Sequence, residues 1–281
     1  MLVLDFPLVK DEASLKQIFK DPVWSPYSAT WSQAYRNYDS VNGDPWRIAP
    51  VGFAEEEAKK QHALFKSRSG RGGPIGRIRS RGGLKCCPMC GSPMTGSLDH
   101  YLPKEVYPEF SIYSKNLVPA CPACNSGTKG LTYHGKEPSE RFLHPYFDKM
   151  ASAPIWRVVV KPPFAAPAFE AEVLPDLPPS QQAQIAFHLA HILGEQFHLN
   201  MATSFDCVPQ QVRDDLERTP VVDFAAAQMA LGRLLRSAVT TGSTNGWGAA
   251  LCRGMLSDYA VIAHIAAQAN LLSPTPISSL M

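Results

Sequence analysis

The amino-acid sequence predicts an α+β protein in which a cysteine-bounded, β-rich core lies between an N-terminal helical arm and a C-terminal helical lobe. Two Cys-x-x-Cys pairs bracket the core, and the last hundred residues carry apolar side chains at helical spacing. Between these regions lie two short runs rich in β-branched and aromatic residues. We therefore expect three parts, which span residues 1–85, 86–150 and 151–281.

The composition and the net charge of the whole chain do not indicate which kind of partner it binds. The chain has 281 residues, of which 45% are hydrophobic, and its 27 basic residues against 25 acidic ones give a net charge of +2. Any attraction to nucleic acid therefore has to come from a local basic patch. No secretory signal is evident, and the most apolar late stretch carries Arg253, Asp258 and His264. We expect a cytoplasmic protein that does not enter a membrane.

The first part is expected to combine a helix with a basic segment. Residues 52–66 begin with acids and end with lysines, an order that complements the helix dipole. Residues 66–85 hold seven Lys and Arg residues, six glycines and no acid. This composition favours an arm that binds nucleic-acid phosphates, and a flexible linker with solubilising charge is the alternative. The arginines expected to bind are Arg71, Arg77, Arg79 and Arg81.

The two cysteine pairs predict a structural zinc site. Cys87 with Cys90, and Cys121 with Cys124, supply four thiolates, which satisfy tetrahedral Zn²⁺ and leave no open position. Cys86 is a neighbouring alternative to Cys87, but the two-residue spacing favours Cys87. Buried free cysteines or a redox pair are the other interpretations, although a redox Cys-x-x-Cys normally occurs once, near a βαβ unit. Zinc would fix both ends of the segment between the pairs.

That intervening segment contains an ordered set of polar residues. Asp99 and His100 lie in a predicted β-segment, Asn116 follows 16 residues after His100, and Asn125 comes directly after the second cysteine pair. Taken singly, such residues are usually structural hydrogen-bonding, turn or capping residues. In this order and inside a zinc frame, they resemble the signature of the HNH, or ββα-metal, endonuclease family over residues 87–130. The longer pattern "LDHYLPKEVYPEFSIYSKNLVPACPACN", followed by "HPYFD", is similar to that of uncharacterised bacterial HNH proteins.

The resemblance implies a zinc-stapled ββα-metal core that hydrolyses phosphodiester bonds. His100 would be the general base, Asp99 and Asn125 would hold one Mg²⁺ or Mn²⁺ ion, and Asn116 would tie the loop to the hairpin and orient His100. An Asn at position 125, where many members have His, favours a hard cation. DNA is the expected substrate, with RNA as an open alternative, and the products would carry 5′-phosphate and 3′-hydroxyl ends. Lys129 is expected to contact phosphate, or else to be a solvated surface lysine.

The third part is expected to begin with a hairpin and to continue as helices. The β-rich runs "IWRVVVK" and "AFEAEVL" are separated by "PPFAAP". Ile185, Leu189 and Ile192 then follow helical spacing, and residues 221–239 and 255–272 look like two further helices.

Two other functions fit the same sequence. A non-catalytic zinc-ribbon module would bind nucleic acid without cleaving it, although binding alone does not need the Asp-His pair and Asn125. The chain can also be the nuclease effector of a bacterial antiviral defence or toxin system, active only with a protein partner. The C-terminal lobe and the aromatic N-terminal region would then be candidate docking surfaces.

Overall fold

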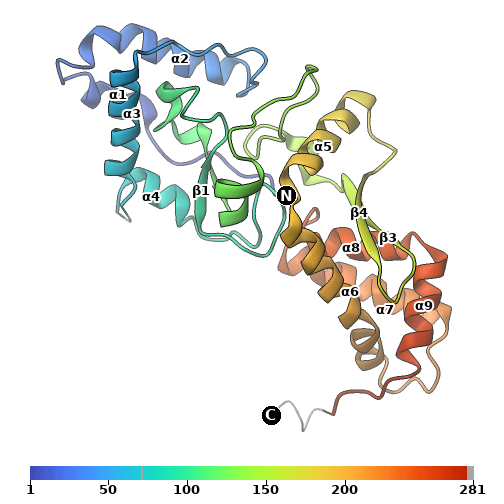
Figure 1. Ribbon diagram of the computed structural model, residues 1–281. Helices are drawn as coiled ribbons and strands as arrows, with labels where there is room; N and C mark the ends of the chain where they lie inside the picture. Colours follow the sequence, from blue (N-terminus) through green and yellow to red (C-terminus); the bar gives the residue numbers. More distant parts are fainter. Residues whose placement is uncertain (71, 277–281) are drawn as a thin grey trace.

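The structure is a computed structural model that describes residues 1–70 and 72–276. It shows an α+β protein, in which the described residues form helices and two small antiparallel sheets of two strands each. Figure 1 shows two lobes, one with α1 to α4 and β1, the other with β3, β4 and α5 to α9. A single cluster of buried apolar residues runs through both lobes.

The N-terminal lobe packs four helices around a hairpin. Aromatic residues of the second helix, including Tyr35 and Tyr38, face Phe110 and Tyr113, with the Tyr35 and Tyr113 ring centroids 4.0 Å apart and those of Tyr38 and Phe110 4.9 Å apart. This cluster holds the loop that joins the two strands of the hairpin. The helix predicted at residues 52–66 is confirmed as the third helix. The four are α1 (Asp11–Ile18), α2 (Ser28–Ser40), α3 (Glu55–Arg68) and α4 (Pro74–Arg79).

The basic segment is folded over part of its length. Pro74 opens α4, where a missing N–H costs nothing, and Ile75 and Ile78 are buried. The helix contacts both strands of the hairpin. Residues 74–79 are therefore neither a free arm nor a flexible linker, because two isoleucines anchor them. Arg71 lies outside the described residues.

The core of the N-terminal lobe is a short hairpin followed by a helical turn. Strand β1 (Ser97–His100) pairs antiparallel with β2 (Leu117–Ala120), with Asp99 opposite Val118 and His100 opposite Leu117. The loop between them contains the 3₁₀ turns η2 (Pro108–Phe110) and η3 (Ser114–Asn116). After β2 comes the π-helical turn η4 (Cys124–Thr128), which includes Asn125. Two further 3₁₀ turns are η1 (Ser25–Tyr27) and η5 (Lys149–Ser152).

The C-terminal lobe begins with the predicted hairpin. Strands β3 (Trp156–Lys161) and β4 (Ala168–Val173) pair antiparallel along their whole length. The helices that follow are α5 (Pro179–Ile192), α6 (Glu195–Asp215), α7 (Phe224–Thr241), α8 (Trp247–Leu256) and α9 (Tyr259–Ala269). Helix α8 lies so close to β3 that a Cβ atom on Gly254 would stand 1.6 Å from the carbonyl oxygen of Val158.

One predicted helix is divided in two. The sequence pattern suggested a continuous helix over residues 255–272, but α8 ends at Leu256 and α9 begins at Tyr259. The carboxylate of Asp258 accepts hydrogen bonds from the amides of Ala260 and Val261, so it caps a new helix. Apolar periodicity continued across the break because both helices bury a face in the same core.

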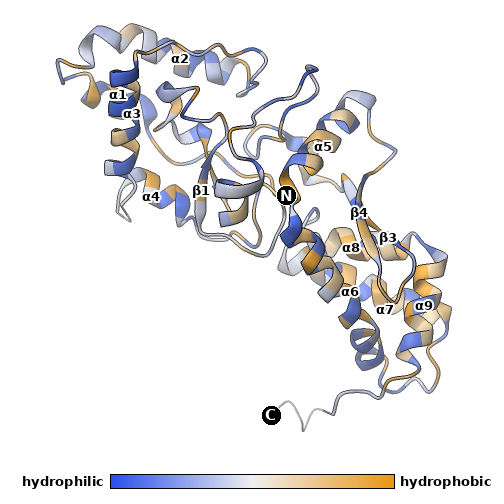
Figure 2. Cartoon of the chain, in the orientation of Figure 1, coloured by the Kyte–Doolittle hydropathy of each residue, from blue (hydrophilic) through white to orange (hydrophobic). Residues whose placement is uncertain are grey.

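Hydropathy differs between the lobes. Figure 2 shows mostly polar residues along α3 and more hydrophobic ones along β3 and α9. Within α3 only Gln61 is fully buried, whereas α9 buries five residues. Across the described residues, no helix is long and apolar enough to cross a membrane.

Candidate functional site

The four predicted zinc ligands meet at one point. The sulfur atoms of Cys87, Cys90, Cys121 and Cys124 all lie within 4.8 Å of one another, and all four residues are buried. The Cys87 and Cys124 sulfurs are 3.9 Å apart, and those of Cys90 and Cys121 are 3.8 Å apart. Four Zn–S bonds of about 2.3 Å in a tetrahedron separate sulfurs by about 3.8 Å. The cluster therefore has the donor chemistry and spacing to hold a structural metal such as zinc.

Backbone amides support the same sulfurs. The Cys121 amide donates to Cys87 Sγ at 3.2 Å, the Cys124 amide donates to Cys121 Sγ at 3.4 Å, and the Ser92 amide donates to Cys90 Sγ at 3.4 Å. Hydrogen bonds to an ionised acceptor are stronger than those between neutral groups. These amides favour the thiolate form that a metal requires.

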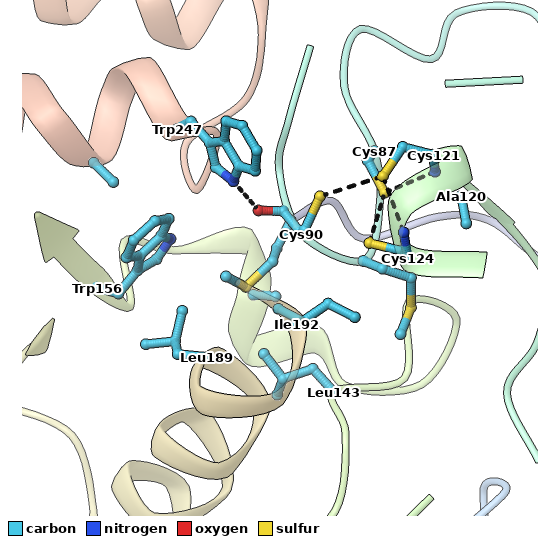
Figure 3. Packing of buried hydrophobic residues seen from close by; sticks show 14 of the residues in the cluster. Cys87, Cys90, Ala120, Cys121, Cys124, Leu143, Trp156, Leu189, Ile192 and Trp247 are labelled. Atoms are coloured by element: carbon cyan, nitrogen blue, oxygen red, sulfur yellow. Dashed lines mark hydrogen bonds between the residues drawn. The ribbon is translucent and has the colours of Figure 1, made fainter. Parts of the chain in front are cut away.

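The cysteine cluster lies where the two lobes meet. Figure 3 shows its sulfurs turned toward one another, with Trp247 of α8 beside Cys90. The Trp247 indole N–H donates to the Cys90 carbonyl at 2.7 Å, and His188 Nε2 of α5 lies 2.8 Å from the carbonyl of Met89. The amide of Leu2 donates to the Pro88 carbonyl at 3.1 Å. Both lobes and the first residues of the chain are thus attached to the first cysteine pair.

His100 ends β1 with a defined hydrogen-bonding state. Its Nε2 lies 2.9 Å from the carbonyl oxygen of Ser111, and a carbonyl can only accept, so Nε2 carries the proton. Burial lowers the pKa of the imidazole to about 4, although the bond to Ser111 opposes the shift. The ring is therefore neutral near pH 7 and Nδ1 bears the lone pair. The ring of Phe65 packs 4.6 Å from it, centroid to centroid.

Asn116 fastens the loop that supplies the Ser111 carbonyl. Its side-chain oxygen accepts from the Leu102 amide at 2.8 Å, and its side-chain nitrogen donates to the carbonyls of Leu102 at 3.0 Å and Phe110 at 3.2 Å. The Tyr38 hydroxyl lies 3.2 Å from the same oxygen. Asn116 is fully buried, and the Phe110 carbonyl that it bonds comes one residue before Ser111, the partner of His100.

His100 and Asn125 open into the same pocket. This pocket has a volume of about 410 Å³, and its other lining side chains include Phe65 of α3, Arg79 of α4 and Lys104. Its full lining is Phe65, Arg79, Gly96, Ser97, Leu98, His100, Lys104 and Asn125. None of these residues is acidic, so the pocket is suited to an anion.

Asp99 is buried beside the pocket rather than in its lining. Its Oδ2 atom lies 3.2 Å from Lys129 Nζ but has no hydrogen bond from the described residues. Burial raises the pKa of the carboxyl to about 6, and the nearby Lys129 ammonium lowers it. Asp99 and Asn125 carry oxygen atoms of the kind that Mg²⁺ takes, but only Asn125 lines the pocket, and Asp99 is paired with Lys129.

Lys129 is not at the surface. Its side chain is 1% exposed, and its ammonium donates to the His100 carbonyl at 2.9 Å besides contacting Asp99. The alternative of a solvated surface lysine is therefore wrong, and the contact with phosphate stays a prediction. The signal that could have indicated burial is weak, because Lys129 ends a turn that is polar in sequence.

The arginines of the basic segment have different environments. Arg79 lines the pocket, and its Nη1 donates to the Ser69 carbonyl at 3.3 Å. Arg77 is exposed to solvent on the same helix. Arg81 donates to the Asp5 carbonyl at 2.6 Å and so is engaged within the protein. The structure therefore brings one of the expected nucleic-acid-binding arginines together with His100.

Two residues beside His100 carried no signal in the sequence. Phe65 fell in a predicted helix with no indication of what it packs against, and Ser111 acts through its backbone carbonyl. Only the packing of α3 and of the loop against β1 shows that these residues contact the His100 ring.

Comparisons with known proteins found a sequence match for a small part of the chain. A stretch of 64 residues is 47% identical to "Protein ea31" of Escherichia phage lambda, which corresponds to 22% of this chain and 21% of the phage protein. The match thus spans about a fifth of the length of that relative, and the name of the relative states no activity. No protein-family model and no solved structure matches the chain.

Proposed function

We propose that this protein is a metal-dependent endonuclease of the HNH type, with DNA as its expected substrate. The observation that carries the proposal is the shared pocket of His100 and Asn125, in which a neutral imidazole presents an unprotonated Nδ1. The order of Asp99, His100, Asn116 and Asn125 within a four-cysteine frame supports it.

His100 is suited to accept a proton from water. The Ser111 carbonyl holds the proton on Nε2, so Nδ1 is the basic atom, and no hydrogen bond from the described residues reaches it. As His100 Nδ1 takes the proton, the water oxygen forms a bond to phosphorus and the P–O3′ bond breaks. This leaves a 5′-phosphate and a 3′-oxygen that takes up a proton from solvent. General-base catalysis of this kind contributes typically about 10²–10⁴-fold.

Oxygen donors for a divalent cation come from Asp99 and Asn125. When bound there, Mg²⁺ or Mn²⁺ would supply neutralisation of charge on the scissile phosphate and on the leaving oxygen. Asn125 reaches the pocket from η4, and Asp99 comes from β1, so the ligands are held by two elements that the zinc frame joins.

Basic side chains in the pocket favour a polyanionic substrate. Arg79 and Lys104 line it together with His100, and Arg77 is exposed on the same helix as Arg79. Contacts from these side chains to phosphates would position nucleic acid without reading its bases, and so would give no sequence preference.

Plasmid cleavage tests the proposal. Purified wild-type protein and His100→Ala are incubated with supercoiled plasmid in Mg²⁺, in Mn²⁺ or in EDTA. Nicking or linearisation by the wild type, lost in EDTA and lost in His100→Ala, is the expected result. Equal cleavage by both proteins would refute the role of His100. No cleavage by either, with zinc bound, would favour a binding module or an effector that needs a partner.

A further inference from the structure

The backbone of the first cysteine pair is held from outside. The carbonyl oxygens of residues 88 to 91 each accept a hydrogen bond from a distant part of the chain. The donors are the Leu2 amide to Pro88 at 3.1 Å, His188 Nε2 to Met89 at 2.8 Å, the Trp247 indole to Cys90 at 2.7 Å and the Trp247 amide to Gly91 at 3.1 Å. Three of these four bonds come from α5 and α8 of the C-terminal lobe, and Figure 3 shows the indole beside Cys90.

Hydrogen bonds at the second cysteine pair are local. The carbonyl oxygens of residues 121 to 123 accept from the Asn125 amide at 3.1 Å, the Ser126 hydroxyl at 2.9 Å and the Thr128 hydroxyl at 3.4 Å. All three donors belong to the turn η4. The turn at the second pair is thus shaped by its own residues, whereas the turn at the first pair depends on the C-terminal lobe.

His188 of α5 is a donor with a defined proton. The Leu143 amide donates to its Nδ1 at 3.0 Å, so that nitrogen is unprotonated. Burial lowers the pKa of the ring to about 4, and the neutral ring carries its proton on Nε2, which donates to the Met89 carbonyl. His188 and Met89 are both fully buried, so water does not replace this hydrogen bond if the donor is lost.

These contacts bear on metal binding because of where they fall. A Cys-x-x-Cys pair holds a metal when its backbone turn directs both sulfurs at the ion. Met89 lies inside that turn and Cys90 ends it, so the bonds from His188 and Trp247 fix the positions of both sulfurs of the pair. Loss of a group that orients a metal ligand without touching the metal typically lowers metal affinity by about 10–100-fold.

We infer that His188 and Trp247 are positioning residues for the first cysteine pair, so that retention of a metal by the four cysteines depends on the C-terminal lobe. The inference does not rest on nuclease activity, since it concerns only the cysteine cluster, and a negative plasmid experiment would leave it unaffected. Coupling is reciprocal, so a bound metal strengthens the attachment of α5 and α8 to the first pair by the same factor.

The zinc affinity of the folded, full-length protein tests the role of His188. It is measured by competition between the protein and a high-affinity chelator. His188→Asn keeps an acceptor near the position of Nδ1 but has no donor that reaches Met89, and His188→Gln keeps a donor near the position of Nε2. We expect His188→Asn to lower zinc affinity by about 10–100-fold and His188→Gln to restore most of it.

A pair of tryptophan variants tests the second contact. Trp247→Phe removes the indole N–H that bonds Cys90 and keeps an aromatic ring, and it should lower zinc affinity to a similar extent. Trp156→Phe is the matched control, because its indole donates to the Asn245 carbonyl, at 3.2 Å in the same lobe, and not to the cysteine pair. This control should bind zinc as the wild type does.

Each other outcome would overturn the inference. Wild-type affinity in both His188→Asn and Trp247→Phe would show that the lobe does not position the cysteines. Equal losses in His188→Asn and His188→Gln, or in the two tryptophan variants, would assign the effect to packing instead of these hydrogen bonds. A wild type that binds no zinc would refute the metal site and the inference with it. Should His188→Asn fail to fold, as judged by circular dichroism, Trp247→Phe decides the matter.

Discussion

The Nε2 atom of His100 lies 2.9 Å from the carbonyl oxygen of Ser111, and this contact sets the chemistry of the ring. The acceptor is a backbone atom in a loop that Asn116 holds through three hydrogen bonds. A carbonyl partner selects the tautomer with the proton on Nε2 and leaves Nδ1 as the base. The basic nitrogen of the ring is therefore Nδ1, and not the Nε2 atom that contacts the loop.

The first prediction concerns the protonation of His100. Because burial lowers its pKa to about 4, the ring should remain neutral, with its proton on Nε2, from pH 8 down to about pH 5. Nitrogen-15 NMR of the imidazole groups, assigned with His100→Gln, measures this directly. An imidazolium at pH 6, or a proton on Nδ1, would contradict the interpretation.

The second prediction separates two arginines of α4. Arg79 lines the pocket and Arg77 is exposed, so only Arg79 is placed to meet the reacting phosphate. At saturating protein, Arg79→Ala should lower the single-turnover rate of cleavage by about tenfold to a hundredfold. Arg77→Ala is the control and should change the affinity for DNA and its salt dependence but not this rate. Equal rates for the two variants would argue against contact between Arg79 and the phosphate.

The third prediction concerns the four buried cysteines, which could hold a structural metal such as zinc. Cys121→Ser removes one ligand, and the site joins both lobes, so the free energy of unfolding should fall by more than about 3 kcal/mol. Bound zinc, measured by atomic absorption, should fall from about one per chain to well below that. Cys207→Ser changes an exposed cysteine of α6 and should leave both quantities unchanged. Full stability of Cys121→Ser would mean that the cluster needs no metal.

The fourth prediction concerns the contact between α8 and β3. A methyl group on Gly254 would lie 1.6 Å from the Val158 carbonyl oxygen, so Gly254→Ala has to displace the helix or the strand. We expect a loss of about 3 kcal/mol in the free energy of unfolding, measured by chemical denaturation. Gly248→Ala on the same helix is the control, because its methyl would meet only the Ala238 side chain, at 3.5 Å. Similar stabilities for the two variants would refute the close approach.

The fifth prediction concerns a buried acid behind the loop. Glu109 is fully buried, its Oε1 accepts from the Val51 amide at 3.0 Å, and its Oε2 has no hydrogen bond from the described residues. Burial raises its pKa from 4.5 to about 7. The folded protein therefore binds more protons than the unfolded chain between these values, and the stability that Glu109 contributes is lost as the pH rises through them.

Glu109→Gln removes this dependence. At pH 8 the variant should be more stable than the wild type by roughly 1–3 kcal/mol, and the gain should shrink toward zero near pH 4.5. Denaturation at both pH values measures the difference, and Glu56→Gln, an exposed change on α3, serves as the control. A gain of the same size at both pH values would show that ionisation of Glu109 is not its cause.

Residues close together in the chain were predictable. The two-residue spacing of each cysteine pair is a local geometry that lets two sulfurs reach one ion, and the structure brings both pairs together. Alternating β-branched residues predicted the β3–β4 hairpin, and the acid-to-base order predicted α3. Apolar periodicity failed at the boundary between α8 and α9, because a capping side chain rather than the pattern decides where a helix starts.

The sequence by itself indicated the two cysteine pairs, the β-segment that carries Asp99 and His100, and the order of the polar residues, since each of these is read from short-range spacing. Only the tertiary structure decided that Lys129 is buried against Asp99, that Arg79 shares a pocket with His100, and that Ser111 selects the tautomer of His100. Each of these contacts joins residues ten or more positions apart. Their partners depend on how separate elements pack, and neither the type of a residue nor its neighbours in the chain specify that packing.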